Sequence, residues 1–300
     1  MADTTAHDAA STAALGVSWV DGRLLEPGEA ALRADDHAIV VGDGVFETTK
    51  VVNGVPFALS RHLRRLVRSA SGLGLNEPSE GLIRTAIDDV LTADPAAGLL
   101  RITWSSGPGP LGSGRGGGPG TLVVSTSGGN VWPNAEQVHL VPWARNEHGA
   151  LTGLKTTSYA ENVLALATAR REGGTEALFR NTAGMLCEGT GTNLFLVVDG
   201  RLVTPPLSSG CLAGVTRELI LELVGREPLA TQVGDVEVRD VDPDELLTAD
   251  EAFLTSATRN VSAISAVTGE VEATFDPAPG PVTVQIATAF DDLEAHTPDP

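Results

Sequence analysis

The chain has 300 residues and a mass of 31.0 kDa, which suffices for one large domain or two modest domains with a full core. Its net charge of −19 argues against binding to nucleic acid or to anionic lipid, because such partners require clusters of Lys and Arg. The two cysteines give no disulfide framework, no apolar run approaches the roughly 20 residues of a membrane span, and residues 1–16 lack the features of a signal peptide, so we expect a cytosolic protein.

The N-terminal part of the chain predicts hairpins followed by helices and further strands. Residues 1–16 are rich in Ala, Thr, Ser and Asp and are expected to form a disordered tail. Asp21-Gly22 and Asn53-Gly54 are typical of two-residue turns and predict hairpins over 17–24 and 45–59. The apolar spacing then predicts a helix that Ser60 caps and that ends near Gly72, a helix over 82–91, and strands over 99–105, 121–126 and 137–143.

A glycine-rich segment separates two of these strands. Residues 107–120 contain eight glycines and three prolines in 14 positions. A phosphate-binding loop of the GxxxxGK[ST] type is excluded, because that motif is absent and no helix signal follows. The composition favours a flexible surface loop, and a lid over a site is the alternative.

The C-terminal part begins with a linker near 146–153 and again mixes strands with helices. The expected elements are helices over 158–172, 215–224 and 282–293, strands over 176–180, 231–238 and 252–255, a turn at 181–184, and a hairpin over 193–204. The many hairpins predict an α+β fold of two lobes rather than a regular parallel sheet. We place a small α/β domain at 17–142, an interdomain loop at 143–152 and a larger domain at 153–300.

Only two of the 20 basic residues are lysines, Lys50 and Lys155. Lys155 precedes a helix on which Val163, Leu164 and Ala167 are expected to form the apolar face. A lysine at the edge of a buried element can lose its charge and act as a nucleophile or a general base, and the alternative is an ordinary surface lysine. Lys50 is more simply interpreted as a solvated strand residue.

Three further positions have side chains or backbone that can bind charged groups. Glu188 either pairs with a buried cation or is a solvated turn residue. Arg65 lies in an arginine-rich helix and Thr216 opens a helix after Gly214; both features suit a phosphate, while a solvated face and a plain cap are the alternatives. A dinucleotide site at 189–192 is excluded because a strand follows it, and the six dispersed histidines predict no metal site.

Six segments, taken in order, resemble the class IV (fold-type IV) pyridoxal-phosphate enzymes, a family of branched-chain and D-amino acid aminotransferases and 4-amino-4-deoxychorismate lyases. The resemblance covers about residues 17–290, and its motifs are DDHAIVVGDGVFETTK (35–50), RHLRRLVRSA (61–70), GLKTTSYAENVLA (153–165), EALFRNTAGMLCEGTGTNLF (176–195), TPPLSSGCLAGVTRELI (204–220) and EAFLTSATRNVSAI (251–264). It implies a small N-terminal α/β lobe, a larger C-terminal barrel-like lobe, pyridoxal 5′-phosphate between them, a small-molecule amine substrate and a homodimer.

The resemblance also implies a role for each matching residue. Lys155 would hold the cofactor covalently and carry protons, and Glu188 would keep its pyridine nitrogen protonated. The other implied cofactor-binding residues are Arg65, Val215, Thr216, Ser256 and Ala257, which would hold the phosphate, together with Thr192 and Asn193. The implied substrate residues are Phe46, Arg101 and Tyr159, the last of which lies one position earlier than the cofactor-binding Tyr of some relatives.

Departures from the family pattern point to one of its branches. Leu99 stands where branched-chain enzymes carry Tyr, and Ser106 where D-amino acid enzymes carry a carboxylate-binding Arg. Lyases of the family keep a basic residue at the place of Arg101 and often have Ala at the place of Ala257. The resemblance therefore predicts a 4-amino-4-deoxychorismate lyase of folate synthesis, with Arg101 and Arg115 as candidate contacts of the substrate carboxylates.

Three alternatives remain open at the level of the sequence. The first is a transaminase for D-amino acids, branched-chain L-amino acids or amines. The second is an enzyme with both activities. The third belongs to another class, a non-catalytic protein that binds pyridoxal phosphate or a small molecule, and the intact Lys155 and Glu188 argue against it.

Overall fold

The computed structural model describes residues 15–226, 229, 233 and 235–300. The chain packs as two compact units, of which the first ends at Pro133 and the second begins at Asn134. The tail predicted for residues 1–16 lies outside the described residues, apart from Leu15 and Gly16, which begin strand β1 (Leu15–Val20). Over the described ranges, no helix combines the length and apolar character that crossing a membrane requires.

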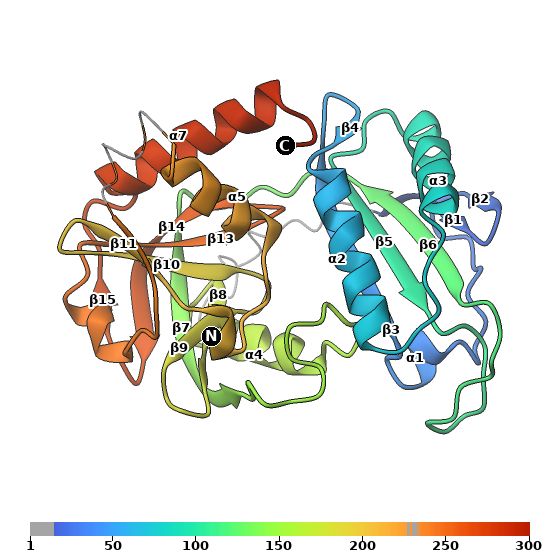
Figure 1. The fold of residues 1–300 in the computed structure, drawn as a ribbon, viewed down its shortest axis with the longest axis horizontal. Coiled ribbons are helices and arrows are strands. Elements are labelled where there is room, and N and C mark those ends of the chain that lie inside the picture. Colours follow the sequence, from blue (N-terminus) through green and yellow to red (C-terminus); the bar gives the residue numbers. More distant parts are fainter. Residues whose placement is uncertain (1–14, 227–228, 230–232, 234) are drawn as a thin grey trace, which may run out of the picture. The chain divides into compact units, whose positions relative to one another are not determined.

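The first unit is built on a six-stranded antiparallel sheet with the strand order β2-β1-β6-β5-β3-β4 (Figure 1). Both predicted hairpins are confirmed, with Asp21 and Asn53 at positive φ in their turns, as such tight connections require. The remaining strands of this sheet are β2 (Arg23–Leu25), β3 (Gly44–Val52), β4 (Val55–Pro56), β5 (Leu99–Ser105) and β6 (Thr121–Ser127).

Helices α2 (Leu59–Gly72) and α3 (Glu80–Ala93) pack against this sheet. Their apolar stripes join alternate residues of the strands in one core, which includes Leu66, Ile83 and Leu100. The alternation of β5 leaves Arg101 on the opposite face of the sheet from that core. A short helix, α1 (His37–Val40), precedes β3.

The two long helices of this unit begin differently. The hydroxyl of Ser79 caps α3 by accepting the N–H of Leu82, at 3.4 Å. Helix α2 has no side-chain cap, because Ala58, in the left-handed conformation with φ of 54°, leads directly into it. The predicted cap at Ser60 is therefore wrong, since Ser60 already lies in the first helical turn.

The glycine-rich segment 107–120 forms a loop that one arginine anchors. Arg115 donates two hydrogen bonds of 2.7 Å to the carboxylate of Asp43, at the start of β3. It also donates to the carbonyls of Leu73 and Gly74, just after α2, at 2.8 and 2.6 Å. Because these four bonds engage its guanidinium, Arg115 acts as an anchor of the loop in this structure rather than as a contact of a substrate.

The second unit contains a nine-stranded sheet whose main path runs β12-β11-β10-β13-β14-β7-β8-β9 (Figure 1). A further pairing of β9 with β10 closes six of these strands into a barrel, which confirms the predicted barrel-like lobe and the two-lobed α+β fold. The strands are β7 (Ala135–Arg145), β8 (Glu176–Asn181), β9 (Leu186–Gly189), β10 (Asn193–Val198), β11 (Arg201–Thr204), β12 (Val236–Val238), β13 (Glu251–Ser256), β14 (Asn260–Gly269) and β15 (Ala273–Thr274).

Strand β7 sets the division between the units. It pairs in parallel with β14 and with β8, so it belongs to the barrel. The strand predicted over 137–143 therefore lies after the division at Pro133 and not before a linker at 143–152. The difference arises because a strand's sequence does not reveal which sheet it joins.

Helices α4 (Ala160–Arg171), α5 (Val215–Val224) and α7 (Pro281–His296) pack against barrel strands, and this unit also contains the 3-10 turns Leu207–Ser209 and Pro243–Leu247. Helix α4 buries Asn162, Ala165 and Ala169, whereas Val163 and Leu164 are 64% and 53% exposed. The expected apolar face of this helix is therefore wrong, because its small residues, and not its large ones, lie against β7 and β8.

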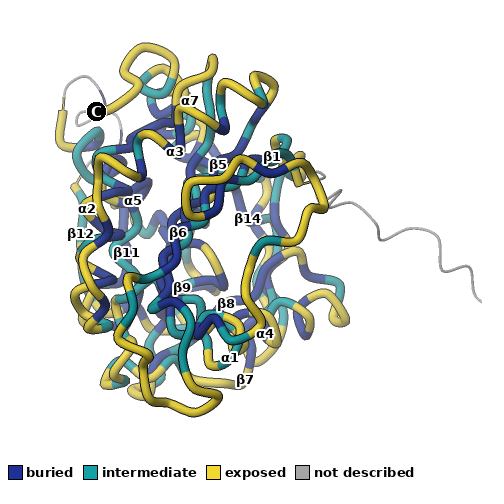
Figure 2. Tube along the Cα trace, turned by 90° about the vertical axis from the view of Figure 1, so that its right-hand side faces the viewer, coloured by how far each residue is buried: buried dark blue, intermediate teal, exposed yellow. Residues whose placement is uncertain are grey.

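Burial follows the strands in both units. The buried colour in Figure 2 runs along strands such as β5, β6 and β8, while the exposed colour marks the loops and the outer faces of the helices. In the barrel, the largest fully buried side chains include Phe195 and Phe253, whose rings stack with centroids 5.0 Å apart. These packed strands form the rigid frame on which the polar groups described below are held.

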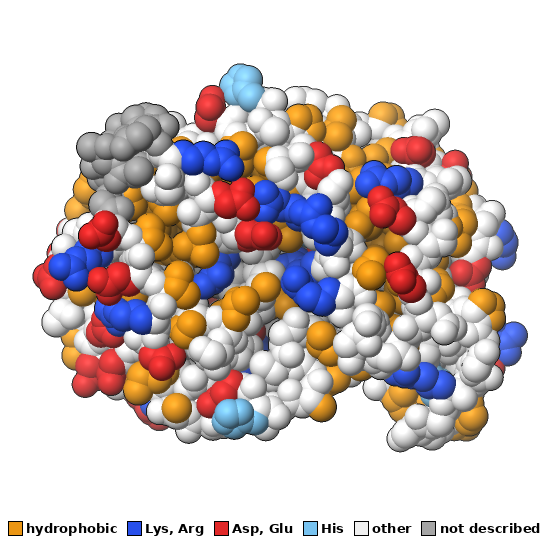
Figure 3. All heavy atoms as spheres, viewed as in Figure 1, with side chains coloured by type: hydrophobic (Ala, Val, Ile, Leu, Met, Phe, Trp, Pro, Cys, Tyr) orange, Lys and Arg blue, Asp and Glu red, His pale blue; other side chains and the backbone are white. Residues whose placement is uncertain are grey.

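Charged side chains of both signs share the molecular surface. On the face shown in Figure 3, acidic and basic side chains lie close to one another, although acidic residues exceed basic ones in the whole chain. Arg239, for example, bonds the carboxylate of Glu245 at 2.7 and 2.8 Å.

Candidate functional site

Lys155 lies in the segment that leads into α4. It is half-buried, and its Nζ lies 5.8 Å from the ring centroid of Tyr159. The turn before it is held to the β8–β9 connection, because the carboxylate of Glu147 accepts the N–H and the hydroxyl of Thr182 at 2.9 and 2.8 Å. The structure thus places the lysine amine beside an aromatic ring.

Tyr159 and Glu188 belong to the same cluster. The Tyr159 hydroxyl donates to the carbonyl of Thr190 at 2.9 Å, and burial together with the nearby Glu188 carboxylate raises the pKa of Tyr159 to about 12. Glu188 lies on β9, with its side chain only 13% exposed, so the alternative of a solvated turn residue is wrong. Its carboxylate accepts the N–H of Leu212 at 2.9 Å and lies 3.5 Å from Nε of Arg145.

The closure of the barrel brings Thr192 and Asn193 to the same region. Asn193 is the residue of β10 that pairs with Glu188 of β9. Its side-chain amide donates to the carbonyl of Leu212 at 2.9 Å. The hydroxyl of Thr192 is buried, and within the described residues it makes no hydrogen bond. A buried hydroxyl of this kind is costly unless a ligand or water bonds it, which fits a position in a binding site.

The start of α5 offers backbone N–H groups to an anion. Helix α5 begins at Val215 without a side-chain cap, and Gly214 precedes it. A Cβ on Gly214 would clash with Oδ1 of Asn193, so this close approach requires glycine. Thr216 is the second helical residue and is 4% exposed, so the alternative of a plain N-terminal cap is wrong for it.

Ser256 and Ala257 lie at the turn from β13 to β14, and α5 packs against β13. The Ser256 hydroxyl accepts the backbone N–H of Arg259 at 3.1 Å and lies 3.4 Å from the hydroxyl of Thr258. Backbone N–H groups at a helix start and small hydroxyl residues are the donor set that a phosphate prefers. The residues of this unit therefore suit pyridoxal phosphate: a lysine amine, a carboxylate and an anion-binding helix start.

The remaining phosphate candidate, Arg65, lies on α2 in the first unit. It donates from Nε and Nη2 to the two carboxylate oxygens of Glu47 at 2.7 and 2.6 Å, and Nδ1 of His62 lies 2.7 Å from the same carboxylate. Burial alone would raise the pKa of Glu47, but Arg65 and His62 outweigh it and lower the pKa to about 2. Sequence reasoning missed Glu47 and His62; the signal was a glutamate in the middle of an apolar strand.

The two substrate candidates of the first unit contact each other. Cζ of Arg101 on β5 lies 3.8 Å from the ring centroid of Phe46 on β3. Phe46 is 4% exposed, whereas Arg101 is exposed. The guanidinium of Arg101 thus lies over the Phe46 ring, on the sheet face opposite the core.

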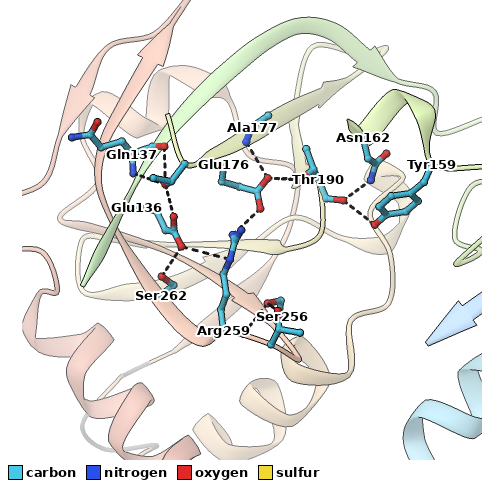
Figure 4. A network of polar contacts seen from close by, with 12 residues as sticks. Glu136, Gln137, Tyr159, Asn162, Glu176, Ala177, Thr190, Ser256, Arg259 and Ser262 are labelled. Carbon is cyan, nitrogen blue, oxygen red and sulfur yellow. Dashed lines mark hydrogen bonds and ion pairs between the residues drawn. The ribbon is translucent and has the colours of Figure 1, made fainter. Parts of the chain in front are cut away.

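A second group of residues that the sequence did not point to is buried in the barrel. Glu136 and Glu176 lie on the neighbouring strands β7 and β8, and Arg259 at the end of the β13–β14 turn reaches both (Figure 4). Among the described residues, no group of three or more His, Cys, Asp or Glu side chains is placed to hold a metal ion. Arg259 is the cation that accompanies these two carboxylates.

Comparison with known proteins agrees with this geometry. The model of the family described as amino-transferase class IV matches residues 44–267. The D-alanine aminotransferase of Bacillus licheniformis is 28% identical over 90% of this chain and 94% of its own length. The bifunctional aminodeoxychorismate lyase / D-amino acid transaminase of Mycobacterium tuberculosis is 31% identical over 69% of this chain and 77% of its own length.

A solved structure has the same fold. The 4-amino-4-deoxychorismate lyase of Pseudomonas aeruginosa superposes with a TM-score of 0.77 and 28% identity, over 94% of this chain and 99% of its own length. The class IV family depends on pyridoxal phosphate, and its relatives here are divided between aminotransferases and lyases. Because the family model spans both units, the chain is a member of the amino-transferase class IV family of pyridoxal-phosphate-dependent enzymes.

Proposed function

We propose that the chain is a 4-amino-4-deoxychorismate lyase, which eliminates pyruvate from its substrate and releases p-aminobenzoate. The observation that carries this proposal is Arg101, whose guanidinium lies over the ring of Phe46, combined with Ser106 after the same strand, where D-amino acid enzymes of the family carry an Arg. The substrate has two carboxylates. An exposed guanidinium is a suitable ligand for one of them.

The proposed roles of the residues follow from their chemistry. Lys155 would hold pyridoxal phosphate and, once the substrate amine has replaced it, would take the proton from the ring carbon that bears this amine. Glu188 would hold a proton at the pyridine nitrogen, which its position on the barrel closure and the orienting N–H of Leu212 support. When bound, pyridoxal phosphate supplies the electron sink that makes this proton removable.

Phosphate binding is proposed for the start of α5 and for the β13–β14 turn, with Val215, Thr216, Ser256 and Ala257 as its residues. Thr192 and Asn193 would line the same pocket, and Arg65 is proposed as an additional phosphate ligand. Tyr159 would contact the cofactor or the substrate through its ring and hydroxyl. A homodimer and a cytosolic location belong to the same proposal, by the likeness to the family.

A single assay tests this function. Cofactor-loaded protein is mixed with 4-amino-4-deoxychorismate, and p-aminobenzoate and pyruvate are measured together. We expect equal amounts of the two products over many turnovers, because one elimination yields one of each. Lys155→Ala should lower turnover by about a thousandfold or more, since it removes the amine that is proposed to carry the proton. Full turnover by this variant would contradict the catalytic assignment.

The second candidate function is a transaminase, favoured by the aminotransferases among the relatives. It predicts conversion of the bound cofactor to its amine form when D-amino acids or branched-chain L-amino acids are added, with no release of p-aminobenzoate. Arg84→Gln, which breaks an exposed ion pair with Glu80 on α3, is the control in both assays. Observation of both reactions by the wild type would show an enzyme with two activities.

A further inference from the structure

Arg259 is a buried cation shared by two buried carboxylates in the barrel. Its side chain is 7% exposed, and those of Glu136 and Glu176 are 0% and 1% exposed. Nη1 of Arg259 donates to Oε2 of Glu176 at 2.7 Å, and its Nε lies 3.6 Å from Oε1 of Glu136. A charge buried this deeply is retained only with good partners, and losing one partner leaves the other uncompensated.

Glu176 also accepts hydrogen bonds from Thr190. The other carboxylate oxygen, Oε1, accepts the backbone N–H of Thr190 at 3.2 Å and also its hydroxyl, in addition to the N–H of Ala177 at 3.0 Å. Two donors of one residue on one oxygen fix the peptide that follows β9. Glu176 therefore orients Thr190, and Arg259 orients Glu176.

The carbonyl of Thr190 in turn contacts two side chains, one on α4 and one at the start of this helix. It accepts the hydroxyl of Tyr159 at 2.9 Å and the side-chain amide of Asn162 (Figure 4). Tyr159 is the ring beside Lys155, and Glu188 lies two residues before Thr190 on β9. A shift of the Thr190 peptide would therefore move the acceptor of the Tyr159 hydroxyl.

The backbone of Arg259 holds the β13–β14 turn, which contains the phosphate candidates Ser256 and Ala257. Its N–H donates to the Ser256 hydroxyl at 3.1 Å and so closes the turn that contains Ala257. One residue thus joins the β13–β14 turn to the Thr190 peptide, across strands that are far apart in sequence. Glu176 and Arg259 are 83 residues apart.

We propose that Arg259 is a positioning residue for the cofactor site, acting through Glu176 and Thr190 on Tyr159 and through its own turn on Ser256. The proposal rests on the proposed binding of pyridoxal phosphate but not on the choice between lyase and transaminase. In this chain of contacts, Arg259 bonds Glu176, Glu176 bonds Thr190, and Thr190 bonds Tyr159. The effect of Arg259 is to keep two sides of the site at a fixed separation.

The test measures cofactor binding rather than turnover. Dissociation constants of pyridoxal 5′-phosphate are measured with the apoprotein of the wild type, Arg259→Gln, Arg259→Lys and Arg180→Gln. We expect Arg259→Gln to weaken binding about tenfold, because a charged hydrogen bond is lost and Glu176 is released. Arg259→Lys should restore part of the affinity. Arg180 lies on the same strand as Glu176 and forms a partly exposed ion pair with Glu270. Arg180→Gln removes this pair and should bind the cofactor like the wild type.

A double-mutant cycle with Tyr159→Phe separates positioning from general stability. If Arg259 acts through Thr190, loss of the Tyr159 hydroxyl should weaken binding several-fold in the wild type but less than about twofold in Arg259→Gln. Fully multiplicative effects, or wild-type affinity in Arg259→Gln, would overturn the proposal. If Arg259→Gln does not fold, Thr190→Val replaces it in the cycle, since it removes a donor to Glu176 and leaves the buried charges intact.

The outcomes for this inference and for the proposed function are distinct. If the wild type binds the cofactor but releases no p-aminobenzoate, only the proposed lyase activity is contradicted. If the wild type binds no pyridoxal phosphate and borohydride traps no adduct on Lys155, both proposals are contradicted. If the wild type binds the cofactor tightly and is an active lyase, but Arg259 and Tyr159 show no coupling, only the positioning role is contradicted.

Discussion

The two units bury arginines in opposite ways. In the first unit one carboxylate, Glu47, receives two basic side chains, Arg65 and His62. In the second unit one guanidinium, Arg259, lies between two carboxylates, Glu136 and Glu176. The first arrangement orients an arginine, while the second uses an arginine to orient its carboxylate partners.

The hydrogen bonds show why both arrangements are tolerated. Glu47 is the common acceptor of two basic groups, and its pKa is lowered to about 2. Glu136 depends less on Arg259, because it accepts the hydroxyls of Thr175 and Ser262. In the barrel, neutral hydroxyl donors thus take the place that a second basic side chain has beside Glu47. We therefore expect loss of the carboxylate charge to lower stability more at Glu47 than at Glu136.

The largest expected effect is on the stability of the first unit. Glu47→Gln should lower the free energy of unfolding by about 3 kcal/mol, because the buried Arg65 loses the charge that compensates it. Urea unfolding followed by tryptophan fluorescence measures this, since Trp19 and Trp104 are buried in the core of that unit. Glu80→Gln, which breaks an exposed pair with Arg84 on α3, is the control and should change stability by less than about 0.5 kcal/mol.

The same carboxylate predicts an acid dependence. The pKa of Glu47 is lowered from 4.5 to about 2, so its contribution to stability is present above pH 4.5 and is lost as the pH falls toward 2. The wild type should therefore lose stability on the order of 3 kcal/mol more than Glu47→Gln across this interval. Unfolding curves at each pH give the free energy of unfolding of the wild type and of Glu47→Gln. If the two free energies change in parallel with pH, the low pKa of Glu47 is contradicted.

Local elements of the fold could be predicted from the sequence, and the contacts that build the site could not. Asp21-Gly22 and Asn53-Gly54 define their hairpins, and the start of α5 follows from Gly214, because turn and helix signals are local. Strand β14 was missed because its small Ser and Ala residues give little hydrophobic alternation. The side chains on α4 were misjudged for a related reason, since close packing against β7 and β8 selects small residues.

Only part of the site could be predicted from the sequence, for the same physical reason. Lys155 stands out because lysine is rare in this chain, and Glu188 because a carboxylate between small residues is unusual. Glu136, Glu176 and Arg259 carry no local signal, since only the pairing of β7 with β8 and β14 brings them together. Their sequence neighbours therefore give no indication of a role that depends on strand pairing.

The smallest expected effect tests the contrast between the two arrangements most sharply. Glu136→Gln should cost less than about 1 kcal/mol, although Glu136 is as buried as Glu47. The new amide can still accept the Ser262 hydroxyl through its oxygen. The Thr175 hydroxyl lies 3.2 Å from the carbonyl of Gln137, so it can turn to that carbonyl and accept from the new N–H.

Hydrogen exchange of peptides from β7 and β8, measured by mass spectrometry, reports the stability of the barrel directly. Glu270→Gln, at the partly exposed end of the Arg180 pair, is the control for loss of one carboxylate in this unit. Removal of Glu136's charge leaves Arg259 paired one to one with Glu176, which preserves the contact that holds Thr190. Equal losses for Glu136→Gln and Glu47→Gln would mean that both carboxylate charges are needed in the barrel, and that the hydroxyls of Thr175 and Ser262 do not substitute for a second cation.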